Sequence, residues 1–191
     1  MIDEKSDNSA LTSIYYGQNI NKKKWKLDKY KNSLKLLKII GDLLSDICNQ
    51  NKPNKEEILL LQSFIMKKIP PISIVDFLER LSKYSKVSHE VFILTLIYID
   101  RICNFYKFNL NYNNIHKLIL ASFITSIKFL EDDFYSMDIY AKIGGVSIKE
   151  LIHLEYAFLK LIKFNLFVDE NLFDLYKNNL YNVEDDYDEE K

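Results

Sequence analysis

The sequence predicts an all-α protein, a single five-helix bundle with flanking N- and C-terminal helices. Apolar residues recur at spacings of three and four along most of the 191 residues, and no segment of useful length alternates like a strand. Proline, which interrupts helices, occurs only at Pro53, Pro70 and Pro71. Two segments, 88–107 and 115–131, are apolar nearly all round, which is typical of helices that are buried on every side.

Flanking parts surround the bundle on both sides. An amphipathic helix at about 28–48 and a short one at about 56–68 precede it, and the Pro-Pro pair ends the short helix. An extended stretch and a last amphipathic piece follow the bundle. We therefore divide the chain into a disordered lead, N-terminal flanking helices, the bundle, a C-terminal flanking helix and an acidic tail: 1–27, 28–68, 69–166, 167–181 and 182–191.

Start and stop signals delimit the helices of the bundle, which we predict at about 72–85, 88–107, 115–131, 136–143 and 147–163. Ser88 and either Asn113 or Asn114 are suitable N-cap residues, and Ser147 with Glu150 forms a capping box. We expect the core to include six apolar side chains: Phe92, Leu96, Ile119, Phe123, Ile127 and Leu159.

A glycine pair, Gly144 and Gly145, stands out in a chain that has only 4 glycines. The short fourth helix must stop and reverse direction before Ser147 begins the next one. Glycine adopts the left-handed backbone conformation without steric cost, so it commonly ends helices. We expect one of the two glycines to have a positive φ.

The composition excludes several functional classes. A formal net charge of −1 gives no global basic field for nucleic acid or an anionic membrane, and the basic run at 21–31 reads as a solvated start to a helix. The longest apolar run, 91–99, is about half the length of a membrane-spanning helix. The N-terminus lacks the pattern of a secretory signal, and two cysteines, Cys48 and Cys103, fit reduced thiols. We expect cytoplasmic or nuclear localisation, or both.

No catalytic or metal-binding pattern emerges from the residues. The three histidines, His89, His116 and His153, share no ligand spacing with Cys, Asp or Glu. Neither a nucleophile in a recognisable context nor a strand ahead of the Gly-Gly pair is present. We predict no enzyme activity, cofactor, metal or small-molecule substrate.

A few charged residues interrupt the apolar helices. Lys128 lies near the end of one helix, Glu155 lies within a later one, and Asp100-Arg101 closes a third. Lys128 suits the C-terminal end of a helix dipole, so a purely local role remains open. The alternative is a polar centre within an interface, where Lys128 and Glu155 could serve one docked segment without pairing with each other. The only two arginines, Arg80 and Arg101, are expected to have geometric roles that lysine cannot fill.

These interruptions, in this order, resemble the cyclin box, a five-helix domain. The matching stretches are YIDR at 98–101, KFLED at 128–132 and LEYAFLKLIKFNL at 154–166. The sequence is more similar to the P-type or U-type cyclins, relatives of the fungal phosphate-signalling cyclins, through ISIVDFLERLSKYS at 72–85 and YAKIGGVS at 140–147. The resemblance covers roughly residues 65–180.

The resemblance implies a non-catalytic regulatory subunit that binds and activates a cyclin-dependent protein kinase. Its third and fifth box helices would dock on the mobile regulatory helix of the kinase. Lys128 would bond carbonyls of the docked helix, Glu155 would complete the clamp and Phe129 would supply buried area. Asp132 and Asp133 would face basic residues of the kinase. The residues expected to stabilise the box are Asp100, Arg101, Arg80, Gly144 and Gly145.

The sequence differs from the cell-cycle cyclins at a position that matters for substrate docking. Cell-cycle cyclins carry an arginine within a hydrophobic substrate-docking patch, and Pro71 takes that position here. That patch is not expected, and Arg80 or Arg101 is left to hold Asp100. Two alternatives remain: a cyclin-fold module that binds nucleic acid or transcription proteins, which the neutral charge disfavours, and a helical scaffold that binds proteins without activating a kinase.

Overall fold

A computed structural model describes residues 34–51 and 59–189. The predicted lead at 1–27 and the start of the helix at about 28 lie outside the described residues. A helix covers residues 34–50, and seven labelled helices follow it within the compact unit Leu36–Lys191. They are α2 (Leu59–Gln62), α3 (Ile74–Ser85), α4 (His89–Tyr106), α5 (Ile115–Leu130), α6 (Met137–Gly144), α7 (Ile148–Leu161) and α8 (Glu170–Glu189).

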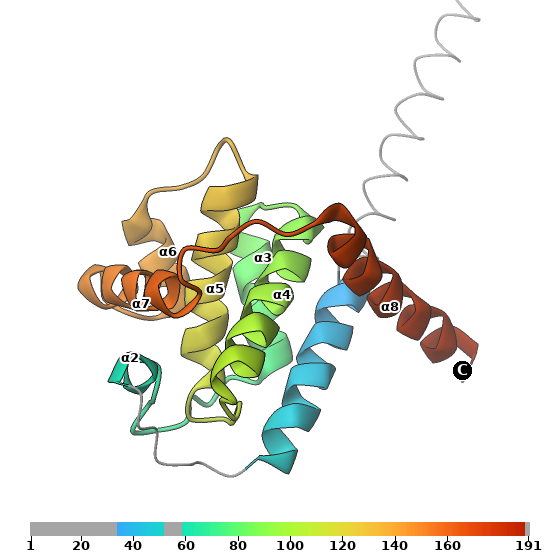
Figure 1. The fold of residues 1–191 in the computed structure, drawn as a ribbon, viewed down its shortest axis with the longest axis horizontal. Coiled ribbons are helices and arrows are strands. Elements are labelled where there is room, and N and C mark those ends of the chain that lie inside the picture. Colours follow the sequence, from blue (N-terminus) through green and yellow to red (C-terminus); the bar gives the residue numbers. More distant parts are fainter. Residues whose placement is uncertain (1–33, 52–58, 190–191) are drawn as a thin grey trace, which may run out of the picture. The chain divides into compact units, whose positions relative to one another are not determined.

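The fold is all-α, as predicted, and α3 to α7 match the five predicted helices of the bundle to within a few residues. Figure 1 shows α4 and α5 side by side. In addition, α7 packs against α5, and α3 packs against α6. The described part of the chain contains no strand. None of the described helices is both long enough and apolar enough to cross a membrane.

The contact between α4 and α5 forms the centre of the core. The rings of Phe92 and Phe123 lie 5.2 Å apart between the two helices, and both side chains are buried. Buried hydroxyls in the same contact are bonded: Ser122 Oγ donates to the Thr95 carbonyl at 2.9 Å. Since burial of one such apolar side chain stabilises a fold by about 1.5–3 kcal/mol, this contact is a major source of stability.

Five of the six predicted core residues are buried, and Leu159 is not. On α7 the buried side chains are Leu151, Leu154, Ala157, Phe158 and Leu161. Leu159 lies one position, or about 100° of helix rotation, beyond the buried Phe158. An apolar residue on this helix therefore does not by itself mark the core.

The prediction of a helix at 56–68 is wrong for the residues after Gln62, where α2 ends. Residues 56–58 lie outside the described residues, and the helix ends at Gln62. The Met66 amide donates to the Asn113 carbonyl at 2.7 Å, and Asn113 Nδ2 donates to the Met66 carbonyl at 3.1 Å. These tertiary hydrogen bonds take the backbone groups that a longer helix would need.

The predicted N-cap residues lie at the starts of their helices, but only one of them caps its helix through its side chain. Ser147 Oγ accepts from the Glu150 amide at 3.1 Å, as a capping box requires. The side chains of Ser88 and Asn114 do not cap their helices. Instead, the Ser88 amide donates to Glu131 Oε1 at 2.9 Å, so the end of α5 is fastened to the start of α4.

The last helix, α8, runs to Glu189 and thus continues through most of the predicted acidic tail. No glycine or proline follows residue 169, so nothing in the sequence stops the helix. Three side chains attach α8 to the bundle: Leu180 is buried, Phe173 packs partly buried against the core, and the Tyr176 hydroxyl donates to Asp100 at 2.7 Å.

The glycine pair has two separate functions in the turn between α6 and α7. Gly145 has a φ of 71°, as expected for one of the two glycines. The amide of the next residue, Val146, donates to the Ala141 carbonyl at 3.0 Å. Gly144 is helical and touches α5, where a Cβ atom would lie 2.5 Å from Leu120 Cδ2.

Both Gly144→Val and Gly145→Val should lower the melting temperature. In Gly144→Val the new side chain overpacks the contact with Leu120, which should cost about 1–3 kcal/mol of stability. In Gly145→Val a β-branched residue must adopt the left-handed conformation, which should cost about 1–2 kcal/mol. At about 2–4 °C per kcal/mol, each shift is measurable by thermal denaturation. Gly145→Asn is the control and should lose less, since asparagine tolerates this conformation. An unchanged melting temperature in either valine variant would contradict this account.

His116 is a buried histidine on α5. Its Nε2 donates to the Ile72 carbonyl at 3.1 Å, and its Nδ1 has no hydrogen-bond partner within the described part of the chain. Burial lowers the pKa of His116 below the ordinary value of 6.5, partly opposed by the bond to Ile72. The folded protein therefore binds this proton less readily than the unfolded chain does.

The stability that neutral His116 provides is complete above pH 6.5 and is lost as the pH falls from there towards the folded pKa. We expect the melting temperature of the wild type to fall between about pH 7.5 and about pH 5.5, and to fall less steeply in His116→Gln. Thermal denaturation across this range checks the slopes. Parallel slopes for the two proteins would overturn the assignment.

Candidate functional site

The structure brings Lys128 and Glu155 together. Lys128 Nζ lies 2.7 Å from Glu155 Oε1 and 2.8 Å from Oε2, so the ammonium bridges both carboxylate oxygens. The lysine comes from the last turn of α5 and the glutamate from the middle of α7. The Glu155 side chain is 13% exposed and the Lys128 side chain 35%, so this is a partly buried ion pair that water still reaches from the lysine side.

Exposed apolar side chains lie on the same two helices, within three residues of Lys128 or Glu155 in the sequence. Ile152 and Tyr156 on α7 are 51% and 52% exposed, and Phe129 at the end of α5 is 46% exposed. We define the α5–α7 face by these three residues with Leu130, Lys128 and Glu155. Monomeric soluble proteins rarely expose such apolar groups together unless they form an interaction surface.

The exposed side of α7 explains the error at Leu159. Ile148, Ile152, Glu155, Tyr156 and Leu159 recur at spacings of three and four on the side of α7 opposite its buried residues. Leu159 therefore follows the same outer stripe as Glu155, one turn further along. Sequence periodicity could not separate the two stripes because both are apolar.

Asp132 and Asp133 are exposed in the connection between α5 and α6, directly after the α5–α7 face. Phe134, half exposed, follows them. Glu131, for which we predicted no role, fixes the start of this connection through its bond to the Ser88 amide. The acidic pair thus begins at a fixed point and projects from the surface.

The expectation that Arg80 or Arg101 holds Asp100 is wrong. Asp100 Oδ2 accepts from Asn104 Nδ2 at 2.8 Å and from the Tyr176 hydroxyl at 2.7 Å. Burial, followed by the bond to Asp100, raises the pKa of Tyr176 above its usual value, so the hydroxyl stays the donor. Asp100 therefore binds a side chain of α8 and not an arginine. No local sequence signal connects Asp100 with Tyr176, because the two residues lie far apart in the chain.

Both arginines instead bind backbone carbonyls. Arg101 donates to the Asn165 carbonyl at 2.6 Å and to the Phe167 carbonyl at 3.2 Å, which holds the segment between α7 and α8. Arg80 on α3 donates to the Lys142 carbonyl at the end of α6, at 3.1 Å. Both arginines therefore hold neighbouring backbone segments rather than Asp100.

Within the described residues, no group of three or more His, Cys, Asp or Glu side chains is arranged to hold a metal ion. The α5–α7 face itself combines one ion pair with exposed apolar and aromatic groups. Such a face suits protein binding.

A family comparison decides what kind of protein carries this face. The sequence model of the family described as Cyclin matches residues 6–166. The chain belongs to the cyclin family. We expected the resemblance to begin at about residue 65, but the family match begins at residue 6. The match therefore includes the segment that precedes the bundle.

Individual relatives identify the branch of the family. PHO85 cyclin-7 of Saccharomyces cerevisiae is 36% identical over 155 residues, 74% of this chain and 54% of the relative. The PHO85 cyclin-like protein psl1 of Schizosaccharomyces pombe is 37% identical over 152 residues, 72% of this chain and 63% of the relative. Cyclin-U4-1 of Arabidopsis thaliana is 33% identical over 146 residues, 74% of this chain and 72% of the relative. The resemblance to P-type or U-type cyclins is confirmed, and the cyclin spans between half and two thirds of the length of the two fungal relatives.

The two members of the ion pair should contribute unequally to stability. Lys128→Ala leaves the nearly buried Glu155 carboxylate without its partner, whereas Glu155→Ala leaves an ammonium that water can reach. We expect a loss of about 1–3 kcal/mol in the free energy of unfolding for Lys128→Ala and less than about 1 kcal/mol for Glu155→Ala. Urea denaturation of both variants measures the difference. Equal losses, or a larger loss in Glu155→Ala, would show that the pair is not arranged as described.

Proposed function

We propose that this cyclin is a non-catalytic regulatory subunit that binds and activates a cyclin-dependent protein kinase through its α5–α7 face. The observation that carries the proposal is the Lys128–Glu155 ion pair within exposed apolar residues on the two box helices that the family resemblance implicates. The names of the fungal relatives, which describe them as PHO85 cyclins or similar to them, support a partner of this class.

The ion pair is suited to receive the end of a helix. An ammonium group has three N–H donors, and Lys128 directs its bonds to the two oxygens of Glu155, which leaves a donor for a carbonyl of the docked segment. The last four carbonyls of a helix have no partner within that helix, and its C-terminal end attracts cations. Glu155 holds the lysine in place, so little side-chain entropy is lost on binding.

The apolar part of the face supplies the buried area. Phe129, Ile152 and Tyr156 are all about half exposed in the isolated chain and would lose that exposure to a docked helix. Asp132 and Asp133 extend from the neighbouring connection, where we propose that they face basic residues of the kinase and orient its approach.

Activation follows from a preference for one kinase conformation. A protein kinase is active only when its regulatory helix swings inward and completes the Lys–Glu ion pair around ATP. A cyclin that contacts the inward position better than the outward one shifts the population towards the active state. The cyclin itself contributes no reacting group to this mechanism.

The test begins with the kinase that co-purifies with the chain, identified by mass spectrometry and then reconstituted with pure cyclin. Lys128→Ala and Glu155→Ala should each weaken kinase binding by tens- to thousands-fold, because removal of a bonded charge from a buried interface costs about 2–5 kcal/mol. The readouts are affinity and phosphorylation rate, measured at a temperature where both variants remain folded.

Glu150→Ala is the matched control. Lys117 and Glu150 form an ion pair of 2.9 Å between the same two helices, away from the α5–α7 face. This variant should bind and activate the kinase as the wild type does. Wild-type activation by folded Lys128→Ala and Glu155→Ala proteins, or an equal loss in Glu150→Ala, would refute the proposal.

A further inference from the structure

A cavity of about 150 Å³ lies between the helix at 34–50, α4 and the segment that follows α4. Its lining is mainly apolar, and five of the lining side chains are buried: Leu44, Leu96, Ile99, Phe108 and Leu110. The cavity shares no residue with the α5–α7 face. Its volume is well below the roughly 300–1,000 Å³ typical of ligand pockets, so it suits a group the size of one amino-acid side chain.

The polar lining residues lie where the cavity opens to solvent. Asn51, Asp100 and Cys103 are all partly exposed, and we call this part of the cavity its mouth. Burial, followed by the Asp100 carboxylate and the Cys48 thiol, raises the pKa of Cys103 to about 12, so the Cys103 thiol stays neutral. Asp100 is therefore the one lining residue that carries a charge.

Asp100 has no cationic partner in the described part of the chain. Its Oδ2 accepts hydrogen bonds from Asn104 and Tyr176, which are neutral donors, and neither bond involves Oδ1. Arg101, the next residue, donates to two backbone carbonyls instead. No ion pair joins Asp100 to a lysine or arginine within residues 34–51 and 59–189. A partly buried carboxylate beside an apolar cavity, without a cation of its own, favours a cationic ligand.

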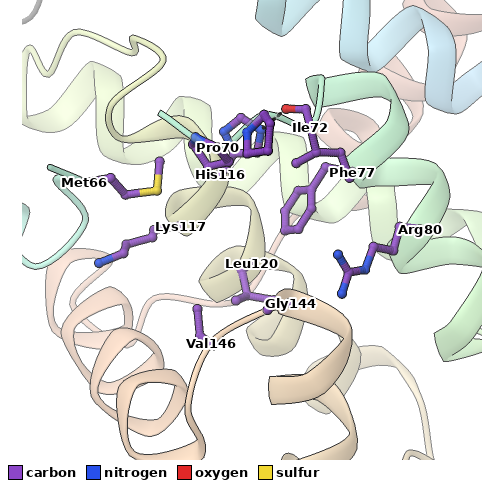
Figure 2. A pocket seen from close by; sticks show the side chains of 12 residues that line it. Met66, Pro70, Ile72, Phe77, Arg80, His116, Lys117, Leu120, Gly144 and Val146 are labelled. Carbon is purple, nitrogen blue, oxygen red and sulfur yellow. Dashed lines mark hydrogen bonds between the residues drawn. The ribbon is translucent and has the colours of Figure 1, made fainter. Parts of the chain in front are cut away.

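A second cavity carries charges of the opposite sign. Figure 2 shows this second cavity, to which α3 contributes Arg80 and α5 contributes His116 and Lys117. These three are its ionisable lining residues. A cationic ligand is therefore attracted to Asp100 and disfavoured at the second cavity.

The arrangement of apolar and charged groups decides which cation fits. A lysine side chain carries its ammonium at the tip, so a lysine that entered the cavity would bury that charge among apolar side chains. An internal aliphatic residue would fill the cavity but would leave Asp100 without a cation. The N-terminal residue of a polypeptide carries an α-ammonium and a side chain on the same carbon atom. Its ammonium can stay at the mouth while its side chain enters the apolar part.

We propose that this cavity binds the free N-terminal residue of a partner polypeptide when that residue is aliphatic. The α-ammonium pairs with Asp100, and the side-chain carbonyl of Asn51 offers a further acceptor at the mouth. The aliphatic side chain packs among the buried lining residues, and the rest of the polypeptide leaves through the mouth. Because the cavity and the α5–α7 face are made by different residues, the proposal does not depend on kinase binding.

Four heptapeptides test this against the isolated cyclin by fluorescence anisotropy at pH 7, where an α-amino group with its ordinary pKa of about 7.7–8.0 is mostly charged. The peptides begin with Leu, acetyl-Leu, Ser or acetyl-Ser-Lys, continue with Gly and Ser, and carry fluorescein at the C-terminus. We expect the free Leu peptide to bind at least about ten-fold more tightly than the other three, because only it provides both a charge-assisted pair and a buried side chain.

Asp100→Asn removes the charge and keeps an acceptor for the Tyr176 hydroxyl. This variant should lose the preference for free Leu over acetyl-Leu and keep the preference for Leu over Ser. Asp174→Asn is the matched control, because it removes an exposed carboxylate of α8 outside the cavity. The control should bind all four peptides as the wild type does.

Cys103→Leu, which fills the cavity, should abolish binding of the free Leu peptide and provides a second route if Asp100→Asn does not fold. The proposal is overturned if no peptide binds, if acetyl-Leu binds as tightly as free Leu, or if the lysine peptide is preferred. It is also overturned if folded Asp100→Asn still prefers free Leu over acetyl-Leu, or if Asp174→Asn loses that preference equally.

Discussion

The contact between α4 and α5 is the interaction on which the rest of the molecule depends. Both helices are apolar nearly all round, so neither is stable in water until other helices cover it. Their packing, with Phe92 against Phe123, places α5 where α7 can pack across it. Only the two ends of α5 then reach the surface, and its C-terminal end carries the candidate site.

The two ends of α5 have different surroundings. At its C-terminal end, Lys128 leaves the core and meets Glu155, so charge and exposed apolar groups lie together. Near its N-terminal end, His116 and Leu120 line a cavity together with residues of α3. The buried centre of α5 keeps both ends in fixed positions, which favours binding without rearrangement.

Helix positions and most of the core could be predicted from the sequence, because periodicity and start or stop residues are local signals. The same signals failed where tertiary contacts decide. Leu159 belongs to an apolar stripe that faces outward, and the segment after Gln62 gives its backbone groups to Asn113 rather than to a helix.

The candidate site was predictable in part. Lys128, Phe129 and Glu155 stood out because a charge or an exposed aromatic residue on an apolar helix needs an explanation, but their direct pairing depends on how α5 and α7 cross. The bond between Asp100 and Tyr176 spans 76 residues, and no spacing rule reaches that far. Arg80 was noticed only because arginine is rare in this chain.

Hydrogen–deuterium exchange of the cyclin, alone and in complex with its reconstituted kinase, tests whether the α5–α7 face binds the kinase. We expect kinase binding to slow amide exchange at the end of α5, through the connection with Asp132 and Asp133, and over α7, and to leave exchange in α3 unchanged. Protection concentrated on α3 and α6, or no change at the end of α5 and on α7, would contradict the assignment of the α5–α7 face as the kinase-binding surface.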